Sequence, residues 1–189
     1  SDGVATETVV ENRKLAPAGD NVFTVDGVAK PTTAGWSETM VDAQWMHLAG
    51  NVPGADIGYY FPDGATVRGQ RETRTGTWKQ VNSSSAWGST TPYTRNYLSL
   101  SVDHGVNPSG GGYSYVLLPN ATKAQTAAYS AAPAVSILEN TAAVQAVRHE
   151  GLGVTGINFW EDGPTTAASV TTDSKASVML AETADEIEV

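Results

Sequence analysis

Regular alternation of apolar and polar residues predicts a series of short strands along the chain. The clearest case is YLSLSV at residues 97–102, where the leucines and the valine fall on one face and the serines on the other. Residues 141–149 suit a helix or a strand, and their Val and Thr content favours a strand. Further strands are predicted at 21–28, 40–48, 57–61, 73–81, 113–118, 135–138, 156–160 and 177–181.

Turns and loops are predicted between these strands. Asp26-Gly27 is a strong turn dipeptide, and Pro62-Asp63-Gly64 is expected to stop the strand at 57–61. Longer loops are predicted at 82–91, which is polar and about ten residues long, and at 103–112, which ends in a run of glycines.

One short helix is predicted among the strands. Residues 122–130 are rich in alanine, follow Asn120 as a candidate N-cap, and precede Pro133, where the helix has to have ended. Many strands with almost no helix indicate an all-β protein built as a sandwich of antiparallel sheets.

Two neighbouring strands are expected to share a core. Leu98 and Leu100 come from the first, and Val116 and Leu118 come from the second. Between them, Asp103-His104-Gly105 could supply a general base, but such a sequence at a strand end is more often a turn in which the imidazole caps the backbone. We therefore interpret it as a structural corner.

The composition excludes several classes of protein. There is no cysteine, so disulfides and thiolate metal sites are excluded. No run of about 18 apolar residues is present, so we expect no membrane partner, and residues 1–10 lack the basic-then-apolar order of a signal peptide. The formal net charge of −9 argues against nucleic acid as a partner.

Basic residues nevertheless gather in one part of the chain. Residues 65–102 contain five basic residues and a single acidic one, Glu72. This segment is either a solvated sheet face or a groove for an anionic ligand. Of the five tryptophans, only Trp87, which lies in the serine-rich loop, is expected to be exposed and able to stack on a sugar ring. The candidate substrate-binding residues are Arg68, Arg71, Arg74, Lys79, Trp87 and Arg95.

No motif for catalysis or metal binding is present. His47, His104 and His149 lack a short ligand spacing, so we expect no metal. There is no G-x-S-x-G sequence, and the glycines at 110–112 lack the lysine of a phosphate loop. We expect no cofactor and no catalytic residue in this stretch.

Six segments stand out together: GYYFP (58–62), NYLSLSVDHG (96–105), YSYVLLPNAT (113–122), ILENT (137–141), VQAVRH (144–149) and GINFW (156–160). In combination they resemble polysaccharide lyase family 8, which contains hyaluronate, chondroitin AC and xanthan lyases. VENRKL (10–15), FTVDG (23–27) and ASVML (176–180) are similar to further parts of the family.

The resemblance implies the place of this chain within a larger enzyme. The family has a helical toroid, a central super-β-sandwich and a C-terminal β-sandwich. Residues 1–162 are expected to be the latter part of the central antiparallel super-β-sandwich. Residues 163–189 are expected to be a linker, with the Gly, Pro, Thr and Ser composition of a boundary, and the first strand of the C-terminal domain. The strand-like end at EIEV also suggests a piece of a longer protein.

The resemblance also implies a reaction, the β-elimination of uronic-acid polysaccharides. A base removes the C5 proton of the uronic acid and the C4 oxygen leaves, using an Asn, a His, a Tyr and an Arg of the toroid, none of which can be assigned here. We expect a non-catalytic part of a secreted bacterial lyase, with the rest of the lyase and an anionic polysaccharide as partners. Hyaluronan is the first expectation and chondroitin the second. The alternative is a stand-alone carbohydrate-binding module.

Overall fold

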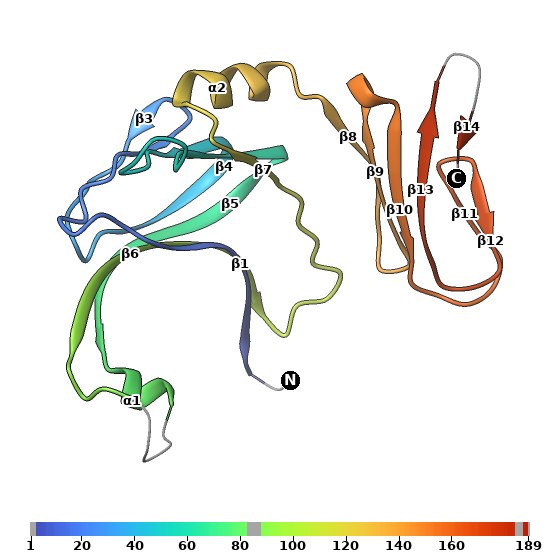
Figure 1. The fold of residues 1–189 in the computed structure, drawn as a ribbon. Coiled ribbons are helices and arrows are strands. Elements are labelled where there is room, and N and C mark those ends of the chain that lie inside the picture. Colours follow the sequence, from blue (N-terminus) through green and yellow to red (C-terminus); the bar gives the residue numbers. More distant parts are fainter. Residues whose placement is uncertain (1–2, 83–87, 184–186, 189) are drawn as a thin grey trace. The chain divides into compact units, whose positions relative to one another are not determined.

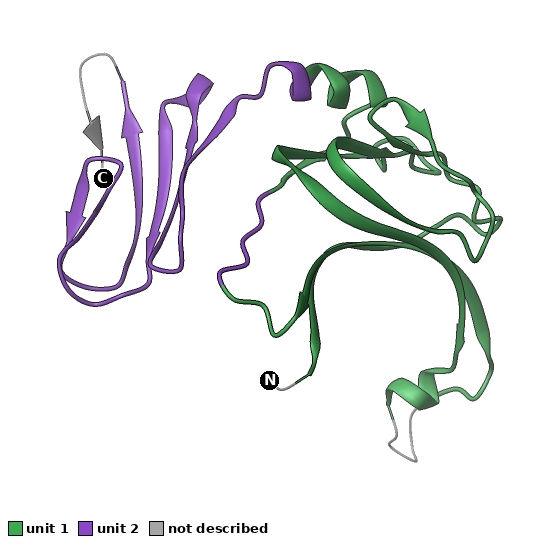
Figure 2. Ribbon diagram, turned by 180° about the vertical axis from the view of Figure 1, so that it is seen from behind, with its two compact units in different colours: residues 1–109, 115–128 green, residues 110–114, 129–189 purple. Residues whose placement is uncertain are grey.

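The computed structural model describes residues 3–82, 88–183 and 187–188. The chain forms two compact units, one of residues 1–109 and 115–128 and the other of residues 110–114 and 129–189 (Figure 2). Antiparallel pairing joins the strands of both units. The predicted all-β class is therefore confirmed.

The first unit is a seven-stranded sheet with the order β1-β6-β5-β4-β2-β3, and β7 adds to β5 (Figure 1). The long strand β5 pairs with β4 in its first part and with β6 from Val67 to Gly76. The strands are β1 (Ala5–Lys14), β2 (Phe23–Val25), β3 (Val28–Ala29), β4 (Ser37–Leu48), β5 (Ile57–Gly76), β6 (Tyr93–Val106) and β7 (Val116–Pro119).

The core of the first unit lies on one face of this sheet. Leu98 and Leu100 of β6 are fully buried, which confirms the predicted alternation. Phe23 meets Trp36 edge-on, with the ring centroids 6.1 Å apart. Burial of each large side chain contributes about 1.5–3 kcal/mol. Other members of the core are Met46, Leu48, Tyr59, Phe61 and Val67.

The turn predicted at Asp26-Gly27 is confirmed, and it also braces β4. Both residues have positive φ, 45° and 86°, as a two-residue hairpin between β2 and β3 requires. The Asp26 carboxylate accepts hydrogen bonds from the backbone N–H groups of Gln44 and Trp45. The hairpin is thereby tied to the irregular part of the neighbouring strand.

The turn predicted at Pro62-Asp63-Gly64 is wrong, because β5 passes through these residues. The register of β4 and β5 shifts between Met40 and Trp45, which marks a β-bulge. Gly64 has a φ of 68°, and a side chain there would collide with the Asp42 carboxylate. Proline and glycine bend this strand rather than end it.

The loop predicted from Asp103 begins later than expected. Strand β6 continues to Val106 alongside β1, and the imidazole Nε2 of His104 lies 2.8 Å from Thr8 Oγ1. The Asp103 carboxylate accepts a hydrogen bond from the N–H of Gly105, whose φ is 76°. The proposed corner is therefore an irregular part of a strand pair.

The predicted contact between the strands at 97–102 and 113–118 is also wrong. Strand β7 pairs with β5, from Ile57 opposite Pro119 to Tyr60 opposite Val116. Val116 and Leu118 are only half-buried and Leu117 is exposed, because a single pairing at the edge of the sheet leaves this strand partly open.

The predicted helix is confirmed as α2 (Lys123–Ala131), but its cap differs from the expectation. Thr122 Oγ1 accepts a hydrogen bond from the N–H of Gln125, and Gln125 Oε1 accepts one from the N–H of Thr122. Asn120 precedes the helix with a φ of 61°. Neither α2 nor the other helical segments described have the length and apolarity needed to cross a bilayer.

A second helix replaces the end of the strand predicted at 73–81. Strand β5 ends at Gly76, and α1 (Trp78–Val81) follows. Thr77 and Gln80 form a reciprocal capping box, with Thr77 Oγ1 accepting from the N–H of Gln80 and Gln80 Oε1 from the N–H of Thr77. The T-x-x-Q sequence is therefore the local reason for the helix.

The second unit contains a five-stranded antiparallel sheet with the order β14-β13-β10-β9-β8 and a two-stranded sheet, β11-β12. The strand predicted at 141–149 is confirmed as β9. Val144, Ala146, Ile157, Phe159, Ala167 and Leu180 form the core. The elements are β8 (Val135–Asn140), β9 (Val144–His149), the 3-10 helix η1 (Glu150–Leu152), β10 (Val154–Phe159), β11 (Thr165–Ala167), β12 (Val170–Thr172), β13 (Ala176–Glu182) and β14 (Ile187–Glu188).

The boundary between the units lies near residue 129, whereas the sequence pattern predicts a boundary after residue 162. The segment expected to be a linker instead forms the β11-β12 hairpin, and Ala167 in it is buried in the second core. The Thr, Ser, Pro and Gly composition of this segment marks a hairpin within a unit.

Candidate functional site: an aromatic and cationic pocket

Strands β1, β6 and β5 present a row of polar side chains on the face opposite the core. The register places Tyr97 between Lys14 and Glu72, and it places Arg95 opposite Arg74. Alternation along β5 sends residues 68, 70, 72 and 74 to this face, and residues 67, 69 and 71 to the core face.

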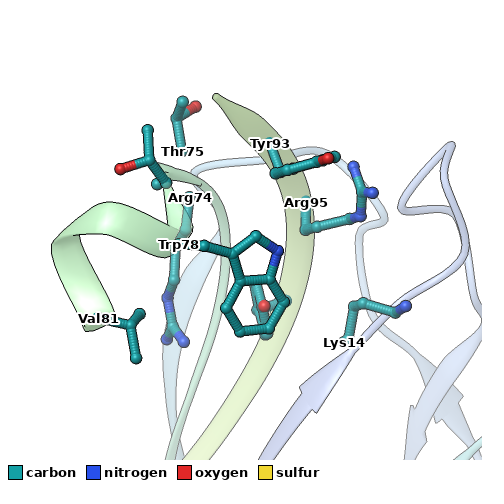
Figure 3. A pocket seen from close by; sticks show the side chains of 10 residues that line it. Lys14, Arg74, Thr75, Trp78, Val81, Tyr93 and Arg95 are labelled. Atoms are coloured by element: carbon teal, nitrogen blue, oxygen red, sulfur yellow. The ribbon is translucent and has the colours of Figure 1, made fainter. Parts of the chain in front are cut away.

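A pocket of about 670 Å³ lies at the α1 end of this face. Figure 3 shows Trp78 and Val81 projecting from α1, with Tyr93, Arg95 and Lys14 on the strands beside them. This volume falls within the usual range of small-ligand pockets. The lining residues are Lys14, Arg74, Thr75, Gly76, Thr77, Trp78, Val81, Tyr93, Arg95 and Tyr97.

The aromatic side chains of the pocket are unusually open to solvent. Trp78 is 62% exposed and Tyr93 is 43% exposed, although both are large and partly apolar. The capping box holds Trp78 at the first position of α1. An exposed indole beside an exposed phenol ring forms a surface on which the apolar face of a sugar ring can pack.

The charges of the pocket are all positive. Among the described residues that line it, Lys14, Arg74 and Arg95 are basic and none is acidic. The guanidinium of Arg95 lies 5.4 Å from the centre of the Tyr93 ring and donates to the carbonyl of Thr94. In the part of the chain that the structure describes, no carboxylate forms an ion pair with Arg95 or Lys14. Their charges remain available to an anion.

Arg74 is held more firmly than the other two cations. Its guanidinium forms an ion pair with Glu72 and donates to Asn12 Oδ1 at 2.9 Å and Ser99 Oγ at 3.1 Å. The hydrogen bond from Arg74 lowers the pKa of Glu72 and partial burial opposes this shift, while a bond from Gln70 adds to it. Arg74 is thus a fixed wall of the pocket whose charge is already compensated.

A second, polar pocket of about 320 Å³ continues along the same face and shares Arg74 with the first. Two acidic and two basic residues line it, so its formal charge is balanced. Its lining residues are Glu7, Val9, Asn12, Arg68, Gln70, Glu72, Arg74, Ser99, Leu100 and Ser101.

The structure separates the six candidate binding residues. Arg95 lines the aromatic and cationic pocket, Arg68 lines the polar pocket, and Arg74 lines both. Lys79 is a half-buried residue of α1 and lines neither pocket. Trp87 lies outside the described residues.

Arg71 is buried and lines neither of these two pockets. It is only 2% exposed, and its guanidinium donates to the carbonyls of Gly19 at 2.8 Å and Asn21 at 2.6 Å. Burial lowers the pKa of this guanidinium, and the nearby charge of Asp20 opposes the shift. These contacts give Arg71 a structural role, and its burial argues against the predicted role in ligand binding. Strand alternation could have found this, since Arg71 shares the core face with Val67.

Several residues of the site were not predicted from the sequence, and Trp78, expected in the core, is exposed. Tyr93, Arg95 and Tyr97 recur at every second position of β6, a period that indicates one shared face. Trp78 follows the capping residue Thr77, which signals a helix start. Trp160, also expected in the core, is exposed at the end of β10.

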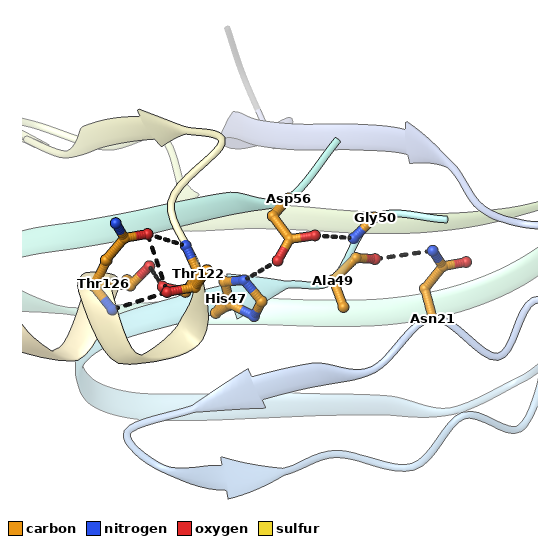
Figure 4. Close-up of polar contacts among 8 residues, drawn as sticks. Asn21, His47, Ala49, Gly50, Asp56, Thr122 and Thr126 are labelled. Atoms are coloured by element: carbon orange, nitrogen blue, oxygen red, sulfur yellow. Dashed lines mark hydrogen bonds and ion pairs between the residues drawn. The ribbon is translucent and has the colours of Figure 1, made fainter. Parts of the chain in front are cut away.

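The buried histidine of the first unit has a structural role. His47 Nε2 lies 3.2 Å from Asp56 Oδ2, and the other oxygen of Asp56 accepts a hydrogen bond from the N–H of Gly50 (Figure 4). Asn21 donates to the carbonyl of Ala49 beside them. These bonds fix the segment between β4 and β5. Within the described ranges, no three His, Asp or Glu side chains are grouped to hold a metal ion.

Comparison with known proteins gives two successive matches. Residues 1–130 match the family described as polysaccharide lyase family 8, super-sandwich domain. Residues 136–189 match the polysaccharide lyase family 8, C-terminal beta-sandwich domain. The interval between the matches agrees with the division between the two compact units.

Individual relatives are much longer proteins. The chain is 54% identical over 185 residues to the xanthan lyase of Bacillus sp. (strain GL1), covering 97% of this chain and 20% of that protein. It is 37% identical over 181 residues to a hyaluronate lyase of Thermasporomyces composti, covering 95% and 22%. The solved structure of Paenibacillus xanthan lyase matches with a TM-score of 0.95 and 58% identity, over 97% of this chain and 18% of that one.

The chain thus spans about a fifth of the length of these relatives. The two matched domains follow each other in the order that the sequence resemblance implied. The chain belongs to polysaccharide lyase family 8.

Proposed function

We propose that this chain is the β-sandwich part of a lyase that cleaves an anionic, uronic-acid polysaccharide by β-elimination. In this proposal the aromatic and cationic pocket holds the polysaccharide, and the bond is broken elsewhere in the enzyme. The observation that carries the proposal is the combination of exposed Trp78 and Tyr93 with Lys14 and Arg95, free of any lining carboxylate.

This combination stands out against the rest of the molecule. The chain has a formal net charge of −9, so it repels polyanions at long range. A local cluster of cations can still attract a sugar carboxylate at short range, where pairing is least screened by salt. Apolar ring faces on Trp78 and Tyr93 add an attraction that does not depend on charge.

The proposed reaction needs three groups that act together. β-Elimination requires a base for the proton at C5, an acid for the leaving oxygen at C4, and a group that neutralises the carboxylate. His47 is held by Asp56, and His104 lies beside Thr8. We therefore propose that the catalytic groups belong to the helical toroid expected in the complete enzyme.

The choice of polysaccharide follows the relatives. Identity to xanthan lyase is 54%, compared with 37% to a hyaluronate lyase, which favours xanthan over the hyaluronan or chondroitin expected from the sequence. We also propose that the enzyme is secreted, because a polysaccharide of high molecular mass does not cross a membrane to reach it.

The test uses the complete lyase and its Trp78→Ala variant. Xanthan, hyaluronan and chondroitin are supplied in turn, and the unsaturated product is followed by ultraviolet absorbance. We expect turnover of one polymer, with KM raised about tenfold or more by Trp78→Ala and kcat little changed, since the indole binds without reacting. Asn51→Ala, an exposed amide that lines neither pocket, is the control.

Three outcomes would contradict the proposal or a part of it. Absence of unsaturated product from all three polymers would exclude the proposed activity. Binding of polysaccharide without turnover by the complete protein would favour the alternative, a carbohydrate-binding module. An unchanged KM in Trp78→Ala would remove the pocket from the binding site.

A further inference from the structure

The polar pocket differs in chemistry from the aromatic and cationic pocket beside it. The two pockets follow each other along the same strands. Asn12 and Gln70 pair with Ser99, which is two residues away from Tyr97 on β6. None of the described residues that line the polar pocket is aromatic. A ligand that lies along the strands therefore passes from a cationic surface to one of amides and hydroxyls.

The charge of the polar pocket disfavours an anion. Glu7 and Glu72 both line it, and they balance Arg68 and Arg74. Glu72 is kept ionised by its hydrogen bonds from Arg74 and Gln70. A carboxylate or sulfate entering here would approach two carboxylates, whereas in the neighbouring pocket it would approach none.

The hydrogen-bonding groups suit an uncharged sugar. Carboxylates accept only, guanidinium groups donate only, and the side-chain amides of Asn12 and Gln70 do both. A sugar hydroxyl can donate and accept, so a ring with several hydroxyls can satisfy both kinds of group at once. The volume of about 320 Å³ is at the small end of the range for ligand pockets and fits a small ligand portion.

We infer that the polar pocket is a subsite for an uncharged sugar unit, adjoining the subsite for the anionic unit in the aromatic and cationic pocket. The inference rests on the proposed function. It adds that the two pockets read different units of one polysaccharide and that Arg74, which lines both, marks the join.

The experiment measures binding, so that it can be read even if the complete protein does not cleave the polymer. Dissociation constants of the complete lyase for xanthan, hyaluronan and chondroitin are determined by calorimetry at low and high salt. The variants are Gln70→Ala and Glu7→Gln in the polar pocket, Arg95→Gln in the other pocket, and Asn51→Ala as the amide control.

We expect Gln70→Ala to weaken binding of the preferred polymer about fivefold, the value of one hydrogen bond, by the same factor at both salt concentrations. The loss caused by Arg95→Gln should shrink at high salt, since that interaction is ionic. Glu7→Gln should leave binding unchanged or weaken it, because the lost charge does not oppose a neutral ligand.

Three results would overturn the inference. Gln70→Ala could match Asn51→Ala, or its effect could vanish at high salt. Glu7→Gln could tighten binding at low salt alone, which would identify an anionic unit in this pocket. If Arg95→Gln still weakens binding in those cases, the proposed site survives and only the inference fails. If no variant changes binding, the proposed site fails as well.

Discussion

The guanidinium carbon of Arg74 lies 4.5 Å from the centre of the Tyr97 ring, with the side chain anchored at the same time to Glu72, Asn12 and Ser99. These partners come from the three adjacent strands β1, β5 and β6. A long and flexible side chain is thereby fixed in one position, where it lines both pockets. Fixing it in advance lowers the entropic cost of ligand binding.

The Arg74–Glu72 pair predicts a pH effect. Because the folded pKa of Glu72 lies below its ordinary value of 4.5, its ionisation stabilises the fold above that value. The contribution should be lost as the pH falls through the lower, folded pKa. Arg74→Ala should raise the carboxyl titration midpoint of Glu72, measured by NMR, toward 4.5. Arg68→Ala should shift it much less, and equal shifts in both variants would contradict a specific pair.

In β6 the buried side chains of Leu98 and Leu100 alternate with the partly exposed Ser99. We therefore predict that two nearby substitutions differ greatly in their effect on the free energy of unfolding. Leu100→Ala should lower the free energy of unfolding of the first unit by about 2–5 kcal/mol, because it leaves a cavity in the core. His104→Ala removes the hydrogen bond to Thr8 at the end of the strand pair, and should cost about 1 kcal/mol. Urea unfolding followed by tryptophan fluorescence compares the two. Equal costs would show that the imidazole has a larger role than its contacts indicate.

Local patterns in the sequence predicted much of this fold. Leu98 and Leu100 could be placed in the core because alternation with serine leaves only one arrangement for a half-buried strand. The bulge at Gly64 could not be predicted, since its signal, Pro-Asp-Gly, is also that of a turn. Strand β5 is continuous through the bulge because β4 pairs with it on both sides of the bulge. Likewise, nothing local indicates that β7 pairs with β5.

The candidate site was predicted only in part. The prediction grouped basic residues that are close in the sequence and did not ask which face of the strand each one occupies. Arg68, Arg74 and Arg95 share the exposed face, whereas Arg71 lies on the core face. Trp78 was predicted to lie in the core because tryptophan side chains are more often buried than exposed. Its exposure results from the helix that Thr77 caps, and that helix interrupts the strand period.

Because Arg71 is buried, we predict that substituting it affects the stability of the fold rather than ligand binding. Arg71→Met leaves the carbonyls of Gly19 and Asn21 without their donors, which should cost about 1–3 kcal/mol for the buried Gly19 carbonyl alone. Arg68→Met, an exposed guanidinium on the same strand, should change stability by no more than about 0.5 kcal/mol. Thermal unfolding gives the comparison. A more stable Arg71→Met protein would show that these bonds do not offset the burial of the charge.

The proposed division of roles between domains predicts that the 189-residue chain alone does not cleave polysaccharide. It should form no unsaturated uronide from xanthan, hyaluronan or chondroitin, because the acid, base and carboxylate-neutralising groups are expected in the toroid. Absorbance of the unsaturated product is the measurement. Turnover that persists through repeated purification would place catalytic groups within this chain.

The salt dependence of polysaccharide binding tests the central claim most directly, namely that the aromatic and cationic pocket holds a polyanion. The dissociation constant of the complete lyase for its preferred polymer is measured over a range of salt concentrations, for the wild type, Lys14→Gln, Arg95→Gln and the exposed control Lys123→Gln. Loss of a cation that contacts the ligand should flatten the dependence of binding on salt. We predict a shallower slope for Lys14→Gln and Arg95→Gln than for the wild type and Lys123→Gln. Parallel slopes for all four proteins would contradict the claim and leave these cations as a solvated sheet face.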